Sequence, residues 1–379
     1  MSIKIAVLGA SYLQKPLYEK LRELNYTSIA ISWDVNEVCV KEGLVDKFHE
    51  VSIVEKEKVL QICQDENIDG IISIASDVAV PVMAYVAEKM NLAGNSIESS
   101  VWSTNKNEMR KRFAKYNLPI PQFSEVFSLN DAKNFLSNTK KDLIIKPADR
   151  SGSLGVQLVP REHSNEELSQ WVDTAINSSF SKTAIIEEFI VGREISVEYI
   201  SFKGEHYFLN TTDKVTSGSP HYVEIEQHQP ALINENILDD VKKIVPKALN
   251  ALGITIGASH TELLIDHNNK IWITEVGSRM GGDFIGSNLT KLSTGYDFVE
   301  AVINLSLGDF SPPEINKSLY SGVLFYSEKT KHILPLINSE NDPRIVEKKV
   351  TSEEVVELKK SSDRGGYLIY QSNKRFKVE

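Results

Sequence analysis

The stretch Thr261-Glu-Leu-Leu-Ile-Asp-His-Asn-Asn-Lys-Ile-Trp-Ile-Thr-Glu275 contains two apolar runs on either side of Asn268-Asn269. Because asparagine tolerates the positive φ of a two-residue hairpin turn, this pattern predicts a β-hairpin. With these two residues as the turn, Glu262 lies directly opposite Glu275, and their Cβ atoms are roughly 5 Å apart. Opposed carboxylates repel each other, and a divalent cation such as Mg²⁺ between them removes the repulsion. If the turn is one residue longer, the two glutamates miss each other and face solvent, so the hairpin alone leaves both alternatives open.

The composition is that of an ordinary globular chain. At 379 residues the chain is long enough for two or three domains, and 41% hydrophobic and 25% charged residues are typical of soluble proteins. A net charge of −10 argues against a general nucleic-acid or membrane-surface binder, which would favour a basic face. The first residues lack the features of a signal peptide, and no apolar run approaches the ~20 residues of a membrane helix. Cys39 and Cys63 have no metal-ligand spacing, which indicates buried thiols in a reducing compartment. Together, these features predict a cytoplasmic protein without nucleic-acid or membrane partners.

The first 95 residues alternate between apolar, strand-like runs and amphipathic segments. The expected strands are residues 3–8, 28–33 and 70–74, and the expected helices are residues 14–25, 54–67 and a segment from Asp77 to about 90. This alternation predicts an α/β domain with a parallel sheet that is covered on both faces. The turn Gly9-Ala10-Ser11 contains one glycine and does not match a dinucleotide-binding fingerprint, so we expect the domain to supply a wall of a substrate site. Asp77 is expected to cap the helix that follows it.

A short loop of serine and glycine follows a strand that ends in lysine. The strand is Asp142-Leu-Ile-Ile-Lys-Pro147, and the loop is Ser151-Gly-Ser-Leu-Gly155. Backbone N–H groups and hydroxyls in such a loop can surround phosphate oxygens, and Lys146 adds a positive charge. The loop lacks the Gly-Lys-Ser/Thr of a Walker A motif, and a flexible hairpin turn remains an alternative interpretation.

A second strand leads into an acidic segment, Ile185-Ile-Glu-Glu-Phe-Ile190, followed by Gly192 and Glu194. The extended backbone after a strand can offer donors and acceptors to the edge of an adenine ring. A carboxylate a few residues further on can accept from both ribose hydroxyls. The alternative is a strand that ends in solvated acids.

In this order, the segments resemble the ATP-grasp superfamily over about residues 1–310. The resemblance includes the helix that begins near Lys106, the Ile144-Ile-Lys-Pro147 strand with its loop, and the two glutamates of the hairpin. It implies three parts: an N-terminal parallel-sheet (pre-ATP-grasp) α/β domain, residues 1–95; an ATP-grasp domain, residues 96–310, with a mobile lid at about 121–188; and a small C-terminal domain, residues 311–379. The pattern of the last part is β-rich, with one charged helix expected near residues 351–359.

The resemblance also implies a site for ATP and Mg²⁺, with Mn²⁺ as a substitute metal. The residues that it assigns to the phosphates are Lys106, Lys146, Ser151, Gly152 and Ser153. The residues that it assigns to adenine and ribose are Glu187, Glu188, Phe189, Ile190 and Glu194. It assigns the metal to Glu262 and Glu275. Many family members have Glu-x-Asn at the second metal position, whereas this chain has Glu275-Val-Gly277, so another group has to replace the asparagine.

The residues after Glu275 are most similar to the branch of carboxylate–amine ligases that includes the L-amino acid ligases, and more distantly to carbamoyl phosphate synthetase. The catalytic residues implied are Arg279, Lys214 and Gly282. Arg279 would stabilise an oxyanion, or else pair with Asp283 on the surface. His221 lies in a Ser/Gly-rich connection and would border the nucleotide and substrate, or else be exposed to water. His260 would lie beside the metal or pack in the core.

The resemblance implies a ligase that joins a carboxylic acid, with an amino acid as the expected substrate, to an amine through an acyl-phosphate. ADP and phosphate are released, both partners are small molecules, and dimers are common among the relatives. A bicarbonate-activating enzyme is the rival, although Arg279-Met-Gly-Gly lacks the Pro-Arg-Pro-His of the purine enzyme. A nucleotide sensor without turnover is a third alternative. The sequence does not name the acid or the amine.

Overall fold

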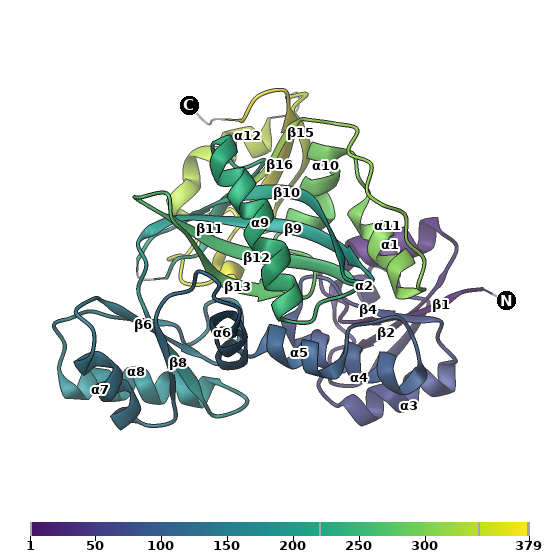
Figure 1. Ribbon diagram of the computed structural model, residues 1–379. Coiled ribbons are helices and arrows are strands. Elements are labelled where there is room, and N and C mark those ends of the chain that lie inside the picture. Colours follow the sequence, from purple (N-terminus) through teal and green to yellow (C-terminus); the bar gives the residue numbers. More distant parts are fainter. Residues whose placement is uncertain (1, 220, 340–341, 377–379) are drawn as a thin grey trace.

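A parallel four-stranded sheet forms the first part of the computed structural model, which describes residues 2–219, 221–339 and 342–376 (Figure 1). The strand order is β3-β2-β1-β4. The strands are β1 (Lys4–Leu8), β2 (Thr27–Ser32), β3 (Lys47–Glu50) and β4 (Gly70–Ile72). The helices are α1 (Lys15–Glu23), α2 (Val38–Lys41), α3 (Lys56–Glu66), the 3₁₀ turn η1 (Asp77–Ala79) and α4 (Val80–Met90). Alternate residues of β1 enter two different cores, so the expected sheet with two covered faces is confirmed.

A second, separate sheet has the order β5-β8-β6-β7 and lies at the lower left of Figure 1. The strands are β5 (Phe123–Val126), β6 (Leu143–Pro147), β7 (Gln157–Val159) and β8 (Ala184–Glu188), and the helices are α7 (Leu129–Ser137) and α8 (Asn165–Ser178). Its residues form a core of their own. It coincides with the segment expected to form the lid, and the mobility of that lid stays a prediction. Two helices, α5 (Ile97–Thr104) and α6 (Lys106–Lys115), precede it.

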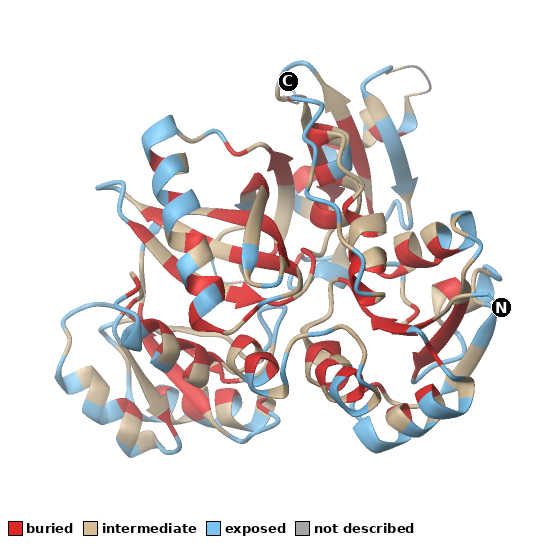
Figure 2. Ribbon diagram, turned by 45° about the vertical axis from the view of Figure 1, so that its right-hand side comes forward, coloured by how far each residue is buried: buried red, intermediate tan, exposed pale blue. Residues whose placement is uncertain are grey.

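The third sheet has eight strands in the order β13-β12-β9-β10-β11-β14-β16-β15. Five come from the centre of the chain: β9 (Gly192–Phe202), β10 (Glu205–Thr216), β11 (Glu224–Gln229), β12 (Gly257–Asp266) and β13 (Ile271–Gly277). Three come from the C-terminal part: β14 (Tyr320–Tyr326), β15 (Ile345–Val350) and β16 (Gly366–Ser372). The long helix α9 (Glu235–Ala251) packs on one face, and the other face shares a core with the first domain. Buried residues run along all three sheets in Figure 2.

The hairpin of β12 and β13 confirms the pairing of the two glutamates but not the expected turn. The turn is one residue longer, since Asp266 pairs with Lys270 and Asn269 has a φ of 61°. Leu263 then lies opposite Ile273, a register that would separate the glutamates. A β-bulge after Glu262 shifts the register by one residue and places Glu262 opposite Glu275 again.

The remaining helices connect the sheets. They are η2 (Ile285–Leu289, a π-helical turn), α10 (Thr290–Thr294), α11 (Phe298–Ser306), η3 (Glu328–Ile333), α12 (Leu334–Asn338) and η4 (Ser361–Asp363). The helix expected near residues 351–359 is wrong: this segment is irregular. The N–H groups of Thr351 and Ser352 donate to the carbonyl of Gly365, and the carbonyl of Glu353 accepts from Tyr326, so the backbone bonds that a helix requires go elsewhere. Within the described residues no helix has both the length and the apolar character needed to cross a membrane.

Candidate active site

Two opposed glutamates and two lysines form the centre of the site. Glu262 and Glu275 lie across from each other on β12 and β13, with 27% and 29% of their side chains exposed. Lys214 Nζ on β10 is 2.6 Å from Glu262 Oε1, and Lys106 Nζ is 3.0 Å from Glu275 Oε1. Burial alone would raise the pKa of Glu262, but the charges of Lys214 and His260 lower it well below its usual value. Each glutamate therefore has a cationic partner, which offsets the repulsion between them.

The carboxylate pair fits Mg²⁺ rather than a fully enclosed metal ion. Within the described residues, no group of three or more His, Cys, Asp or Glu side chains is arranged to hold a metal. Mg²⁺ is usually bound through one or two carboxylates together with waters and substrate phosphates. Glu262 and Glu275 would be the two carboxylate ligands of such an ion, and the lysines beside them would contact the phosphates.

Lys106 connects the glutamates to the predicted phosphate loop. It is the first residue of α6, whose N-cap Asn105 accepts hydrogen bonds from two N–H groups of the first turn. Lys106 Nζ donates to the carbonyl of Arg150 at 2.7 Å, directly before the exposed Ser151–Gly155 loop. Gly152 and Ser153 both have positive φ, 67° and 56°, so the loop turns sharply there. The structure thus brings Lys106, the loop and Glu275 together.

Lys146 and Arg110 both pair with Glu187. The sequence argument missed Arg110. Glu187 is buried between Lys146, at 2.9 Å, and the Nε of Arg110, which is itself 1% exposed. Burial raises the pKa of Glu187, but the two cations lower it to about 2. Arg110 lies one helical turn after Lys106 on α6, and this i, i+4 spacing was the available signal. It also donates to the carbonyl of Thr274 at 2.6 Å, beside Glu275.

The other residues assigned to the nucleoside lie around the end of β8. Glu188 points away from Glu187 and pairs with Lys141 at 2.8 Å. The N–H groups of Glu188 and Phe189 donate to carbonyls of the fold at 2.9 Å each. Glu194 accepts from Lys214, so the predicted ribose carboxylate and the metal glutamate Glu262 share one lysine. The roles of these residues, and of Ile190, towards adenine and ribose stay predictions.

Lys214 is the most heavily paired cation of the site. Its side chain is 5% exposed and contacts Glu194 and Glu262, with Glu224 at 3.7 Å. Burial would lower the pKa of Lys214, but these three carboxylates raise it well above its usual value. Lys214 is therefore a permanent cation beside the metal position.

His260 is buried in a chain of polar contacts. Its Nδ1 contacts Glu198, and its Nε2 is 3.5 Å from Glu262. Burial lowers the pKa of His260, but the fully buried Glu198 raises it to about 9. Glu198 also accepts from the N–H of Gly281 at 3.0 Å. His260 is thus packed and also lies beside Glu262, one of the two glutamates predicted to hold the metal. Glu198, which sequence reasoning missed, connects β9 to the loop after Arg279.

Arg279 pairs with Asp77 of the first domain and not with Asp283. Its Nε and Nη2 donate to the two oxygens of Asp77, at 2.9 Å each. Burial would raise the pKa of Asp77, but Arg279 lowers it below its usual value. The expected capping role of Asp77 is wrong, because Asp77 lies inside η1 and its carboxylate binds this guanidinium. The bidentate pair joins two residues that are 202 positions apart in the chain, and it connects the first domain to the loop after β13.

The same pair explains the glycine that replaces the metal-ligand asparagine. A Cβ atom at Gly277 would lie 2.9 Å from Asp77 Oδ1 and 3.2 Å from Arg279 Nε. A side chain at this position would push the two residues apart. The ion pair thus occupies the space beside Gly277, and a side chain added there as a third metal ligand would have to displace it.

We expect Gly277→Asn to reduce turnover by about 100-fold, since misplacing a reacting group by about 1 Å has this cost. The affinity for ATP should stay unchanged, because the nucleotide residues do not contact Gly277. Steady-state kinetics with each substrate varied would test this. Gly204→Asn is the control, because Gly204 lies in the β9–β10 turn with open space around it; its φ of 82° makes the change at least as demanding for the backbone as the one at Gly277. A Gly277→Asn enzyme with normal turnover would contradict the explanation.

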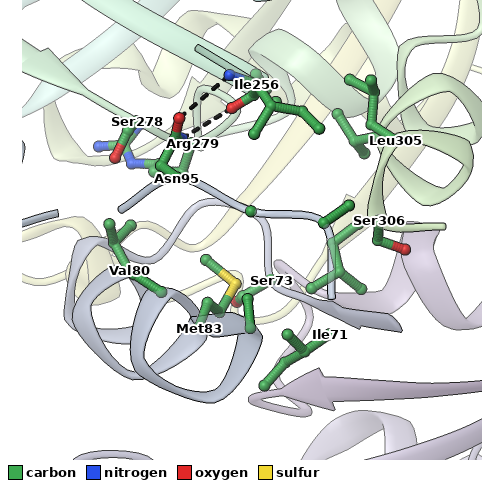
Figure 3. Close-up of a pocket in the computed structure, with 18 of the residues that line it drawn as sticks. Ile71, Ser73, Val80, Met83, Asn95, Ile256, Ser278, Arg279, Leu305 and Ser306 are labelled. Atoms are coloured by element: carbon green, nitrogen blue, oxygen red, sulfur yellow. Dashed lines mark hydrogen bonds between the residues drawn. The ribbon is translucent and has the colours of Figure 1, made fainter. Parts of the chain in front are cut away.

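A cavity of about 100 Å³ adjoins Arg279 (Figure 3). It lies between β4 and α4 of the first domain and the start of β12. Most of its lining is apolar, with Val80, Met83 and Leu305 among the side chains, and Ser278 lies at the Arg279 end. Asn95 closes one wall through hydrogen bonds with the backbone of Ile256 at 2.8 and 3.1 Å. The volume corresponds to about three water molecules.

Two predicted residues remain. Gly282 follows Gly281 in the loop after Arg279, and a Cβ there would meet only Ala75 of the first domain, at 3.5 Å. This loop therefore runs against the first domain. His221 is half-buried in the connection between β10 and β11. Its contact with nucleotide stays a prediction.

Known proteins resemble this chain in sequence and in fold. Residues 139–287 match the family model described as ATP-grasp domain. The chain is 24% identical over 272 residues to the alanine–anticapsin ligase of Bacillus subtilis (strain 168), covering 66% of this chain and 57% of that protein. The chain thus spans little more than half the length of the curated relatives that it matches first.

Solved structures resemble nearly the whole chain. The L-amino acid ligase from Bacillus licheniformis has a TM-score of 0.79 at 21% identity, covering 98% of this chain and 94% of that one. The N5-carboxyaminoimidazole synthetase from Staphylococcus aureus, solved with ADP, has a TM-score of 0.78 at 14% identity, covering 99% and 95%. The chain therefore carries an ATP-grasp domain and has the fold of the ATP-grasp ligases.

Proposed function

We propose that this protein is an ATP- and Mg²⁺-dependent ligase that joins the carboxyl group of an amino acid to an amine through an acyl-phosphate. The observation that carries the proposal is the gathering of Glu262 and Glu275 with Lys106, Lys214 and Arg279 on adjoining elements. One relative is an alanine–anticapsin ligase and one structural neighbour is an L-amino acid ligase, which supports this choice.

The residue types suit both chemical steps. First, a carboxylate oxygen of the acid attacks the γ-phosphorus of ATP, the bond to the bridging oxygen breaks, and ADP leaves. Mg²⁺ supplies charge neutralisation between the two anions. Lys106, Lys146 and Lys214 add fixed positive charge around the phosphates. Next, the amine nitrogen attacks the acyl carbon and loses a proton, and phosphate leaves with the electrons of the carbon–oxygen bond. The charge of Arg279, which Asp77 and the carbonyl of Met280 hold in place, would stabilise the oxyanion of this step.

The Arg279–Asp77 pair favours an amino acid as the acid substrate. A guanidinium can bind a carboxylate with two hydrogen bonds, and a carboxylate such as Asp77 can bind an ammonium group. The two charges lie 2.9 Å apart and pair with each other, so an amino acid, which carries both charges, would bind by exchanging partners with them. The adjoining apolar cavity of about 100 Å³ favours a small apolar side chain.

A bicarbonate-activating ligase is the second candidate. It is favoured by the likeness to N5-carboxyaminoimidazole synthetase, which covers 99% of this chain. Bicarbonate has neither an ammonium group nor an apolar part, so the Asp77 carboxylate and the cavity favour the amino-acid ligase.

The test is a substrate panel. Purified protein is mixed with ATP, Mg²⁺ and either single amino acids, pairs of amino acids or bicarbonate, and the nucleotide and amide products are identified. ADP and phosphate that form only with a particular carboxylate–amine pair support the proposal. AMP and pyrophosphate would exclude an acyl-phosphate, and turnover with bicarbonate alone would favour the second candidate. Tight ATP binding without turnover in any mixture would indicate a nucleotide sensor.

A further inference from the structure

The loop from Arg279 to Asp283 is held at its two ends by different parts of the chain. At the first end, Arg279 pairs with Asp77 of the N-terminal domain. At the other end, Asp283 Oδ2 accepts from Nη1 of Arg364 at 2.9 Å, and Arg364 lies between β15 and β16 in the C-terminal part. The loop that would face the acyl carbon is therefore fixed at one end by the N-terminal domain and at the other end by the C-terminal part.

Arg364 uses nearly all of its hydrogen-bonding capacity in these contacts. Its Nε and Nη2 donate to the carbonyl of Glu224 at 3.0 and 2.7 Å, and Nη2 lies 3.4 Å from the Glu224 carboxylate. The guanidinium stacks 3.7 Å over the ring of Phe325, and its side chain is 6% exposed. A buried planar fork held on one face by an aromatic ring has a fixed orientation. Arg364 thus determines where Asp283 and Glu224 lie.

Both partners of Arg364 lead to the reacting centre. Glu224 lies 3.7 Å from Lys214, which contacts Glu262. Asp283 and the next residue, Phe284, have φ of 48° and 67°, which is strained for residues with side chains. The ring of Phe284 packs on Tyr367 of the C-terminal part, with centroids 4.5 Å apart. The C-terminal part therefore holds this strained turn in place through an ion pair and a ring contact.

We propose that Arg364 is a positioning residue for the second chemical step, in which the amine attacks the acyl-phosphate. The inference rests on the proposed function. Among the residues assigned to ATP, Lys146 pairs with Glu187, and Lys106 contacts Arg150 and Glu275; Arg364 donates instead to Glu224 and Asp283. Its contacts fall on Glu224, which lies beside Lys214, and on the Asp283 end of the loop. Because this loop would face the acyl carbon, a shift of its Asp283 end would change the approach of the amine and leave ATP binding intact.

The experiment separates the two steps with a small amine. Hydroxylamine attacks an acyl-phosphate to give a hydroxamate and phosphate, and it is small enough to need little positioning. We compare wild type with Arg364→Lys, which keeps the charge but loses the fork. Formation of ADP and hydroxamate should stay within about twofold of wild type, while amide formation with the amine found in the substrate panel should fall by about 100-fold, the cost of about 1 Å of misplacement. ADP formed without amide then measures the uncoupling.

Arg344→Lys is the matched control. Arg344 is also in the C-terminal part, pairs with Asp342 and stacks over Phe376 at 4.3 Å; it is 50% exposed and has no hydrogen bond or ion pair with the loop among the described residues. It should leave both steps unchanged. Thermal unfolding of each variant shows whether it folds, and Asp283→Asn, which weakens the same contact from the other side, should uncouple the steps in the same way. Equal loss of hydroxamate and amide in Arg364→Lys, or full amide formation, would overturn the inference. If wild-type protein forms no amide with any pair, the proposed function fails, which is a different outcome.

Discussion

Replacing Glu275 with glutamine is expected to abolish turnover, with a loss of at least ~10²–10³-fold. The substitution keeps the shape of the side chain but removes one of the two charges that would hold Mg²⁺. It also leaves Lys106, which is 6% exposed, without its carboxylate partner at 3.0 Å. The phosphate charge in the transition state then lacks both the metal and a correctly placed lysine.

The measurement is the rate of ADP formation at saturating ATP over a range of Mg²⁺ concentrations. Binding of Mg²⁺ with ADP, followed by calorimetry, is the second readout and should weaken in parallel. Glu205→Gln is the control, because Glu205 is an exposed carboxylate of the same sheet at the start of β10. Turnover near the wild-type rate in Glu275→Gln would refute the metal assignment.

The second large effect is on stability. Glu187→Gln should lower the free energy of unfolding by about 3–5 kcal/mol at pH 7, because it leaves the buried Arg110 and the adjacent Lys146 without their shared counterion. The gap between the usual pKa of 4.5 and about 2 in the folded protein corresponds to about 3 kcal/mol, which agrees with this range. Because the folded pKa is the lower one, this stabilisation is complete above pH 4.5 and disappears as the pH falls through 2.

Denaturant unfolding followed by tryptophan fluorescence would measure the change, and Trp171 in α8 reports on the sheet that contains Glu187. The neighbouring Glu188→Gln is the matched control. Glu188 points the other way and pairs with Lys141, which is 54% exposed, so the loss should be about 1 kcal/mol or less. Equal destabilisation by the two variants would show that the buried Arg110 does not need the charge of Glu187 for stability. The difference between wild type and Glu187→Gln should also shrink between pH 4.5 and 2.

The local features of the site could be predicted from the sequence, because they depend on strand periodicity and turn chemistry. The opposition of Glu262 and Glu275 is such a feature, although it arises differently than expected. The longer turn at Asn269 moves the register by one residue and the bulge after Glu262 moves it back. A bulge has no sequence signature as clear as that of a turn. Counting residues from the expected turn therefore predicted the Glu262–Glu275 pair correctly, but it missed both the longer turn and the bulge that compensates for it.

The partners of the charged side chains could not be predicted, because they come from distant parts of the chain. Arg279 has Asp283 four residues away, yet it pairs with Asp77, which the parallel sheet brings to the same place. Arg364 had no neighbouring motif that marked it, and its role depends on β14 and β16 joining the central sheet. Local preference also failed at residues 351–359, where sheet-edge contacts of the backbone prevail over helix formation.

The arrangement of the three sheets limits which part of the molecule can move during a reaction. β11 and β14 share backbone hydrogen bonds, so residues 311–379 cannot swing away without breaking the ladder from Glu226 to Gln229. Within the described residues, the sheet of β5 to β8 shares no strand with another sheet, and the chain enters it after α6 and leaves it before β9. We therefore expect the eight-stranded sheet to behave as one rigid body, and the sheet of β5 to β8, the predicted lid, to rotate against it when substrates enter.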